Sequence, residues 1–504
     1  MRTKRAIRIV LSSTLLQLII VFSGLLLPRF FLEAYGSEVN GLVASIKQFL
    51  GYFSIAGAGI AVASNAALYK PLAEQDINQT NGILAATKAY FYQTGFIFSL
   101  LLLLFIASFP FIIQTNLSSS FIMLAIFIIG LGAIVEQVLV NKFTVLLVAD
   151  QRNYIISRTT TVGVIINTVV SILFIKLNFS VLTILLVTTL TFYLRLLLMK
   201  RYIRKNYPKV DFNVKPSMDA IKGRWDAFGY QISGIITVYS PVVIISIFCG
   251  LKEASVYSIY NMVFGSLTMI VSIFSAGLSA SFGNIIASDE KKVLIKSFNT
   301  YEHLYFMVTF FCYLCALILI IPFVSLYTKG INDINYILPT LGVLFVCCGL
   351  TYSLRIPYVI LVEAAGKYKE NKMLNIYEAI LNIVLSLILV RYYGILAVLI
   401  AGFITGMIRT ILFIVFTHKN ILNRSHHKVI IRLLVNMVAV LIITFIPFTT
   451  AIDSWFSWLE LAIKVVLITF LVIVSLNVVS DLRASYDLLR RLKLHTKVKS
   501  VLRA

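Results

Sequence analysis

The chain has 504 residues, of which 59% are hydrophobic and 13% are charged, and its net charge at pH 7 is +23. Soluble proteins carry about 25% charged residues, so this composition excludes an ordinary water-soluble domain. Apolar runs of ~20 residues, long enough to cross a bilayer, recur from end to end. We therefore expect an all-α polytopic membrane protein.

About fourteen transmembrane helices are predicted. The expected spans cover 8–31, 39–64, 91–113, 120–148, 159–178, 180–200, 226–249, 254–281, 301–327, 336–362, 373–392, 394–416, 432–451 and 459–480. The first span follows a basic segment, as a signal peptide would, but its apolar stretch is too long and no small-x-small cleavage pattern follows. We expect an uncleaved first helix. Asp76 is expected to start a short interfacial helix before the third span.

Basic residues collect on alternate connections between the spans. The connection 200–224 holds eight of them, and the connection before the thirteenth span holds Lys419, Arg424, Lys428 and Arg432. The opposite side holds only Lys176, Lys252, Lys329 and Arg391. This asymmetry predicts that both termini are cytoplasmic, and it explains the positive charge without a nucleic-acid partner.

The chain repeats itself with an offset near 214 residues. Segment 145–171 aligns with 359–386, Arg195 aligns with Arg409, and GSEVNGLVASI at 36–46 resembles GLKEASVYSIY at 250–260. Six spans fit within one period, so the two copies have the same orientation in the membrane. The predicted domains are an N-lobe at 1–205, a cytoplasmic connection at 206–225, a C-lobe at 226–420, two appended helices at 421–480 and a basic amphipathic tail at 481–504.

The predicted connections are too short to form a soluble catalytic domain, and the sequence contains no GxxxxGK[ST] phosphate loop. We expect a protein that is not an enzyme. The five cysteines fall in or beside spans and are interpreted as apolar core residues. The five histidines lie near the predicted cytoplasmic interface, so no metal, haem or other cofactor is indicated.

Several basic residues fall inside predicted spans, where a cation costs about 2.5–3.5 kcal/mol on insertion scales. The candidate substrate-binding residues are Arg29, Lys47, Lys142, Arg355 and Arg409. Arg195 and Lys464 are expected to extend to the interface instead. Glu136 and Glu378 are the buried carboxylates available for charge pairing or ion coupling, and pairing with them is the structural alternative for the deep cations. The excess of cations favours an anionic ligand, and arginine suits phosphate oxygens.

The segment LPRFFLEAYGSEVNGLVASIKQFLGYFSIAGAGIAVASNAALYKPLAEQD at 27–76 resembles the Wzx-type polysaccharide flippases of the MOP exporter superfamily. IISIFCGLKEASVYSIYNMV at 244–263 is similar to the corresponding second-half motif, and the span layout extends the resemblance over the whole chain. The resemblance implies two six-helix lobes around a central cavity that alternates between the two sides. Related members often carry an aspartate in the seventh span, where this chain reads Thr237-Val-Tyr-Ser-Pro241.

The resemblance also implies the function. The expected substrate is an undecaprenyl-diphosphate-linked oligosaccharide, flipped across the bacterial cytoplasmic membrane for exopolysaccharide, capsule or wall-polymer synthesis. The expected partners are this polyprenyl-diphosphate oligosaccharide, membrane lipids, and the polymerase and glycosyltransferases of the same pathway. One alternative is a cation-coupled drug exporter of the MATE type, which would need carboxylates in its cavity. Another is a membrane polysaccharide polymerase or ligase, which would need a large outer loop.

Overall fold

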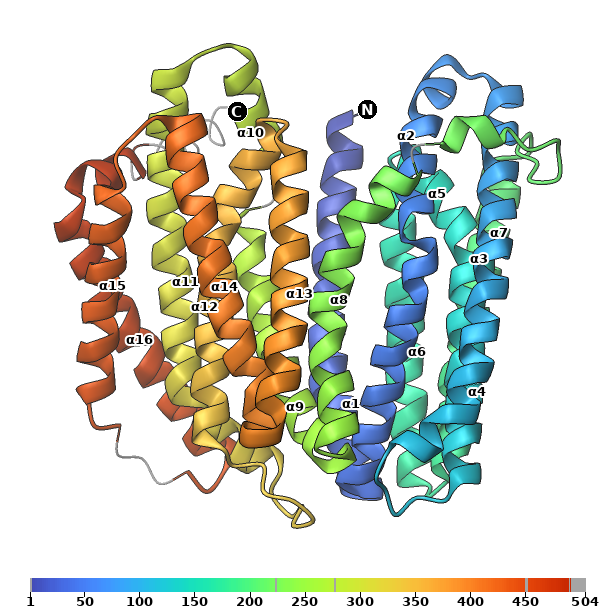
Figure 1. Ribbon diagram of the computed structural model, residues 1–504, viewed down its shortest axis with the longest axis horizontal. Helices are drawn as coiled ribbons and strands as arrows, with labels where there is room; N and C mark the ends of the chain where they lie inside the picture. Colours follow the sequence, from blue (N-terminus) through green and yellow to red (C-terminus); the bar gives the residue numbers. More distant parts are fainter. Residues whose placement is uncertain (1, 223, 276–277, 449–451, 489, 491–504) are drawn as a thin grey trace, which may run out of the picture. The chain divides into compact units, whose positions relative to one another are not determined.

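The computed structural model describes residues 2–222, 224–275, 278–448, 452–488 and 490 (Figure 1). Within these ranges all regular secondary structure is helical. Contacts divide the chain into a first unit, Met1–Ile259 with Gly330–Ile334, and a second unit, Tyr260–Lys329 with Asn335–Ala504. The lobe boundaries expected from the repeat stay a prediction. The predicted amphipathic tail lies mostly outside the described residues.

The first unit contains eight α-helices and the start of a ninth within the described ranges. They are α1 (Arg2–Phe53), α2 (Ala58–Glu74), α3 (Ile77–Ile112), α4 (Ser119–Ile134), α5 (Asn141–Ala149), α6 (Asn153–Lys176), α7 (Val181–Asn206), α8 (Arg224–Phe248) and the first residues of α9 (Leu251–Ile273). A short 3₁₀ turn, η1 (Ser54–Gly57), joins α1 to α2, and a π-helical turn, η2 (Val135–Val140), joins α4 to α5.

Glycine at Gly36 allows the two predicted spans within α1 to turn back on each other. Its φ of 76° lies in the region that side chains other than glycine rarely adopt. In Figure 1 the N-terminal half of α1 runs in one direction and the chain then returns toward α2. Residues on either side of Gly36 therefore reach the same depth of the bundle.

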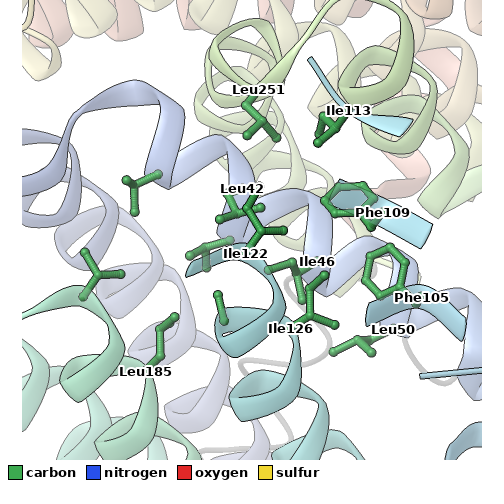
Figure 2. Close-up of a cluster of buried hydrophobic side chains, with 14 of the residues drawn as sticks. Leu42, Ile46, Leu50, Phe105, Phe109, Ile113, Ile122, Ile126, Leu185 and Leu251 are labelled. Carbon is green, nitrogen blue, oxygen red and sulfur yellow. The ribbon is translucent and has the colours of Figure 1, made fainter. Parts of the chain in front are cut away.

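Apolar side chains at helical spacing bury the returning half of α1. Leu42, Ile46 and Leu50 recur every four residues and are each at most 6% exposed. Figure 2 shows them beside Phe105 and Phe109 of α3. This cluster forms much of the core of the first unit and leaves the neighbouring face of α1 for polar residues.

The second unit continues with α9 and adds seven helices among the described residues. They are α10 (Leu278–Ala287), α11 (Lys291–Tyr327), α12 (Pro339–Ala364), α13 (Tyr368–Tyr393), α14 (Ala397–Thr417), α15 (His427–Phe445) and α16 (Trp455–Ser480). α16 packs on α15 and α11, where Cys315, Leu461 and Val465 form a buried apolar cluster. Cys315 is thus a core residue, as the sequence suggested, whereas the other four cysteines are only partly buried.

The helices confirm the expected multi-pass membrane protein. Eleven helical segments of the described residues are long and apolar enough to cross a membrane, and Gly234–Phe248 is a shorter apolar helix. Two of the eleven, Leu11–Phe53 and Met373–Leu422, each contain a glycine at positive φ where one span ends and the next begins. Counting each of these as a pair and the shorter helix as one span accounts for the fourteen predicted.

One local expectation is wrong. Asp76 does not start a separate interfacial helix, because its side chain caps α3 directly by accepting a hydrogen bond from the backbone N–H of Gln79 at 2.9 Å. The helix then continues without a break to Ile112. The capping signal is the one the sequence contains, and the helix it begins is the span itself.

Candidate functional site

A cavity of about 470 Å³ lies inside the first unit. It is bordered by α1, η1, α3, α4, η2, α6, α7 and α8, and much of its wall is apolar, with Leu27, Phe31 and Phe98 among the lining residues. Its polar lining residues are Asn40, Lys47, Ser54, Glu136, Gln137, Asn167, Ser171, Thr188, Thr189 and Tyr239. Amide, hydroxyl and charged groups thus meet in a mostly apolar chamber, as is typical of ligand sites.

Among the residues that the structure describes, Lys47 is the only basic one that lines this cavity. It lies eleven residues beyond Gly36, which at ~1.5 Å per residue places it ~16 Å along the helix, near the middle of a hydrocarbon core of ~30 Å. Among the described residues, no hydrogen-bond or ion-pair partner for its ammonium group is found. A cation at that depth without a carboxylate partner is suited to receive an anion.

A second cavity of about 360 Å³ adjoins the first. Its described lining residues come from α1, α6 and α7, and the two linings share Leu27, Pro28, Lys47, Asn167 and Phe192. Its remaining basic residue is Arg195 of α7. Lys47 therefore stands at the junction of two spaces, one inside the bundle and one between three of its helices.

Arg195 forms an ion pair with Glu136 at the border of the two cavities. The Nη1 atom of Arg195 donates to Oε1 of Glu136 at 2.6 Å, and the side chains are 16% and 27% exposed. The other carboxylate oxygen of Glu136 and Nε of Arg195 are buried without a partner in the described part of the chain. The expectation that Arg195 extends to the interface is wrong, because a carboxylate lies within reach inside the span.

The π-helical turn explains the position of Glu136. Val135–Val140 inserts a wider turn between α4 and α5, and two of its successive residues, Glu136 and Gln137, both line the first cavity. Such turns often occur at functional sites. Hydropathy alone contains no signal for this irregularity, so the sequence indicated a buried carboxylate without indicating where it points.

In the second unit, Glu378 binds two arginines at once. Nη1 of Arg355 donates to Oε1 at 2.8 Å, and Nη1 of Arg409 donates to Oε2, while Nη2 of Arg409 donates to Asn375. The side chains of Arg355, Glu378 and Arg409 are only 5%, 6% and 13% exposed. The triad joins α12, α13 and α14 and carries one net positive charge. None of its members lines either of the two cavities.

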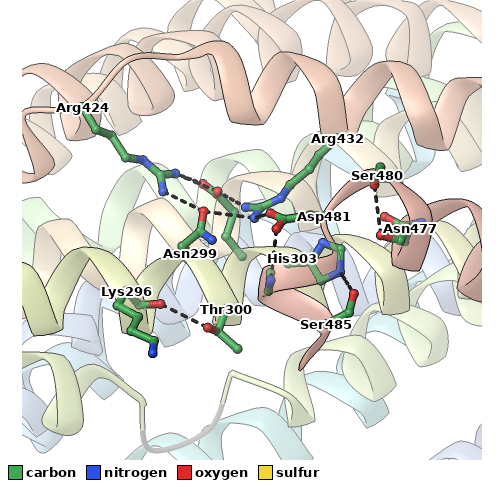
Figure 3. A network of polar contacts seen from close by, with 12 residues as sticks. Lys296, Asn299, Thr300, His303, Arg424, Arg432, Asn477, Ser480, Asp481 and Ser485 are labelled. Atoms are coloured by element: carbon green, nitrogen blue, oxygen red, sulfur yellow. Dashed lines mark hydrogen bonds and ion pairs between the residues drawn. The ribbon is translucent and has the colours of Figure 1, made fainter. Parts of the chain in front are cut away.

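A second buried acid, Glu302 of α11, was not recognised from the sequence. It is fully buried and accepts hydrogen bonds from Nη2 of Arg424 at 2.7 Å to both oxygens, from Arg432, and from the hydroxyl of Tyr358 at 2.8 Å. Figure 3 shows the guanidinium groups of Arg424 and Arg432 pointing toward one another, with Asp481 beside Arg432. The sequence assigned both arginines to a basic connection, whereas they are enclosed by protein.

Asp481 follows the last residue of α16 and completes this network. Burial opposes its ionisation, but hydrogen bonds from the backbone N–H of Ala484 and from Arg432 outweigh burial and lower its pKa. Its Oδ2 lies 2.8 Å from Nη2 of Arg432. The signal that could have revealed this network is Glu302 itself, an acid eleven residues inside a long apolar helix.

The other predicted binding residues lie apart from the cavities. Arg29 is 3.9 Å from Glu33 on the same helix, and Lys142 lies over the rings of Tyr92 and Phe143 at 5.8 and 5.2 Å. Neither Arg29 nor Lys142 lines either cavity. Their assignment to substrate binding stays a prediction. The structure thus brings together Lys47, Glu136 and Arg195, and separately Arg355, Glu378 and Arg409.

The fold is shared with solved membrane transporters. "Lipid II flippase MurJ, inward closed conformation" superimposes with a TM-score of 0.70 at 14% identity, covering 95% of this chain and 100% of that one. An inward-facing multidrug resistance MATE family transporter of the MOP superfamily gives 0.65 at 14% identity, covering 80% and 94%. Its outward-facing counterpart gives 0.56 at 15% identity, covering 82% and 94%. No protein-family model matches the chain, and no curated protein sequence matches it significantly.

Proposed function

We propose that this protein flips undecaprenyl-diphosphate-linked oligosaccharides from the inner to the outer leaflet of the bacterial cytoplasmic membrane, by alternating access, for synthesis of an exopolysaccharide, capsule or wall polymer. The observation that carries the proposal is Lys47, a deep cation without a partner among the described residues, at the junction of two cavities. Both termini are proposed to be cytoplasmic, and the polymerase and glycosyltransferases of the pathway are the proposed partners.

The balance of buried charge supports an anionic substrate. Glu378 serves two arginines, Glu302 serves two more, and Glu136 is already paired with Arg195. Lys47 is left as the accessible cation of the cavity. A diphosphate offers several oxygens to an ammonium group and to nearby amide donors such as Asn40 and Asn167, which line the same space.

The shared fold and the sequence motif support the lipid-linked form of that anion. One structure of the same fold is described as a lipid II flippase, and the superposition covers nearly the whole of both chains. The segment at 27–76 that resembles Wzx-type flippases contains Lys47 itself. The motif therefore includes the residue on which the anionic substrate is argued.

A cation-coupled exporter of the MATE type is the second candidate. The observation that favours it is the oxygen of Glu136 that is buried without a partner among the described residues, since a free carboxylate oxygen in a cavity can hold a proton or a metal ion. The net positive charge of Lys47 and Arg195 beside Glu136 opposes cation binding there.

Deletion of the gene tests the proposed function. The deletion strain is expected to lose the surface polymer and to accumulate lipid-linked repeat units that remain accessible from the cytoplasmic leaflet. Extracted lipid-linked oligosaccharides and cell-surface polymer would be quantified, with plasmid-borne wild-type protein as the control. Normal polymer in a strain without another flippase, together with increased sensitivity to cationic drugs, would contradict the proposal and favour the exporter.

A further inference from the structure

A short helix directly follows α16. The backbone at Asp481 leaves the helical conformation, with φ −143° and ψ 71°, and the chain is helical again over 482–488. Oδ1 of Asp481 accepts a hydrogen bond from the backbone N–H of Ala484 at 3.0 Å, as the side chain of an N-cap residue does. Asp481 therefore ends one helix and begins another, which we call the tail helix.

One face of the tail helix is attached to α11. Ala484 and Ser485 are at most 7% exposed, and Oγ of Ser485 lies 3.1 Å from Nε2 of His303 (Figure 3). Further along the tail helix, Oδ1 of Asp487 lies 3.1 Å from Nζ of Lys296. The contacts move toward the N-terminal end of α11 as the tail helix proceeds, so the two helices are antiparallel.

These contacts place the tail helix at the depth of the lipid headgroups. The apolar stretch of α11 begins near residue 301, and Lys291, Lys292 and Lys296 precede it. Cations at this end belong outside the hydrocarbon core. Residues 296–303 of α11, along which the tail helix lies, cover ~10 Å. Since the two headgroup layers together add about 10–15 Å to a bilayer, the tail helix begins at the hydrocarbon boundary and extends through one of these layers.

The opposite face of the tail helix combines apolar and cationic side chains. Leu482 and Tyr486, one helical turn apart, are 67% and 68% exposed. Arg483 is exposed beside them, and Arg490 is exposed four residues after Tyr486. Neither arginine has an acidic partner in the part of the chain that the structure describes. Tyrosine at headgroup level, with leucine and arginine around it, is typical of a helix in a bilayer interface.

The charge of this region favours an anionic partner. The sequence from 482 to 504 contains seven arginine and lysine residues and one acid, Asp487. Lys296 neutralises that acid, so the remaining charges are positive. An anionic lipid surface attracts a nearby basic residue by about fivefold in affinity. A protein partner would have to bring an acidic surface to this depth, whereas phospholipid headgroups are already there.

We propose that the exposed face of the tail helix binds anionic phospholipid, with Leu482 and Tyr486 at the boundary between headgroups and acyl chains and with Arg483 and Arg490 at the headgroups. Guanidinium groups suit phosphate oxygens because they donate paired hydrogen bonds. The other face of the same helix binds α11, so the lipid surface holds the end of α16 in place. This inference is independent of the transported substrate.

Cysteine accessibility in the full-length protein tests this surface. Tyr486→Cys would be reconstituted in nanodiscs of phosphatidylcholine or of an equimolar mixture with phosphatidylglycerol. Its modification by an uncharged polyethylene-glycol maleimide would be followed, with the wild type as the blank for the native cysteines. Phosphatidylglycerol is expected to slow modification at least about tenfold, because two arginines each contribute about fivefold to lipid binding. Roughly 0.5 M salt is expected to restore the rate, because it screens exposed charges.

Matched variants separate lipid binding from other causes of protection. In the Tyr486→Cys protein, replacing both Arg483 and Arg490 with glutamine is expected to restore fast modification in phosphatidylglycerol. Replacing Arg201 and Arg204 with glutamine removes two exposed charges from the end of α7 and is expected to leave the protection unchanged. Asp219→Cys, at a side chain 86% exposed between α7 and α8, is expected to react at similar rates in both bilayers.

Protection by phosphatidylglycerol that disappears with the two arginines of the tail region supports the proposal. Equally fast modification in both bilayers overturns it and leaves the exposed face for a protein partner. Protection that persists without Arg483 and Arg490 also overturns it. So does equal protection in both bilayers that is lost when residues 491–504 are deleted, because the end of the chain would then cover the helix in place of lipid.

Discussion

Arg195 and Arg409 occupy equivalent positions in the two repeats, yet their surroundings differ. Arg195 has one carboxylate partner, Glu136, and the pair borders two cavities with side chains 16% and 27% exposed. Arg409 shares Glu378 with Arg355 in a triad whose members are at most 13% exposed. Arg195 thus borders accessible cavities, whereas Arg409 belongs to a closed contact among three helices.

The two units differ in how their buried cations are compensated. In the second unit, Glu378 and Glu302 each compensate two arginines, so the buried cations hold helices together. In the first unit Glu136 is paired with Arg195, and Lys47 lies beside open space without an ion-pair partner among the described residues. Truncating one partner of a buried ion pair is strongly destabilising, whereas a partly exposed pair tolerates change better.

The largest expected loss of stability comes from removing the carboxylate of Glu378, which Arg355 and Arg409 share. Glu378→Gln leaves two buried guanidinium groups without a counter-charge and is expected to lower the free energy of unfolding by about 3–5 kcal/mol. Glu136→Gln is expected to lower the free energy of unfolding by only about 1–2 kcal/mol, because it removes a single ion pair that is more exposed than the triad. Thermal unfolding in detergent micelles measures both, with Glu460→Gln as an exposed control. Equal losses of stability in the two variants would show that the Glu378 triad contributes no more to stability than the Arg195–Glu136 pair.

Replacing a buried arginine by lysine is expected to cause a smaller loss of stability. Arg409→Lys replaces a guanidinium that binds both Glu378 and Asn375 with a point charge, and is expected to destabilise by about 1–3 kcal/mol. Arg195→Lys keeps the single contact to Glu136 within reach and is expected to cost less than about 1 kcal/mol. The same unfolding measurement compares the two. A larger loss at 195 than at 409 would show that the closed triad is not the structural element.

The smallest expected effect concerns pH at the Glu302 network. The folded pKa of Asp481 is lowered, so its contribution to stability is present above its unfolded pKa of about 3.9 and is lost as the pH falls through the folded value. Asp481→Asn is expected to remove this part of the acid dependence and to leave stability near pH 7 slightly reduced. Unfolding temperatures followed from pH 6 to pH 3 test it. If the unfolding temperature of the variant falls as steeply with decreasing pH as that of the wild type, other groups cause the acid dependence.

Sequence predicted the helices well because apolar length is a local property. The sequence repeat also aligned Arg195 with Arg409, because the offset between the two copies is constant. It could not identify their partners, since Glu136 lies 59 residues from Arg195 and Glu302 lies 130 residues from Arg432. Those partners are selected by which helix faces meet. The π-helical turn at Val135–Val140 and the empty space beside Gly24 and Gly163 are likewise products of packing, which hydropathy does not encode.

Flipping by the reconstituted protein shows directly whether transport depends on Lys47. Wild-type, Lys47→Met and Lys464→Met proteins would be placed in liposomes with an undecaprenyl-diphosphate-linked oligosaccharide, and the fraction of sugar reaching the opposite leaflet would be followed with an added glycosidase. Lys47→Met is expected to slow flipping at least about tenfold, while Lys464→Met is expected to match the wild type and all three proteins to unfold at similar temperatures. Flipping by Lys47→Met at the wild-type rate would show that the anionic substrate does not bind at Lys47.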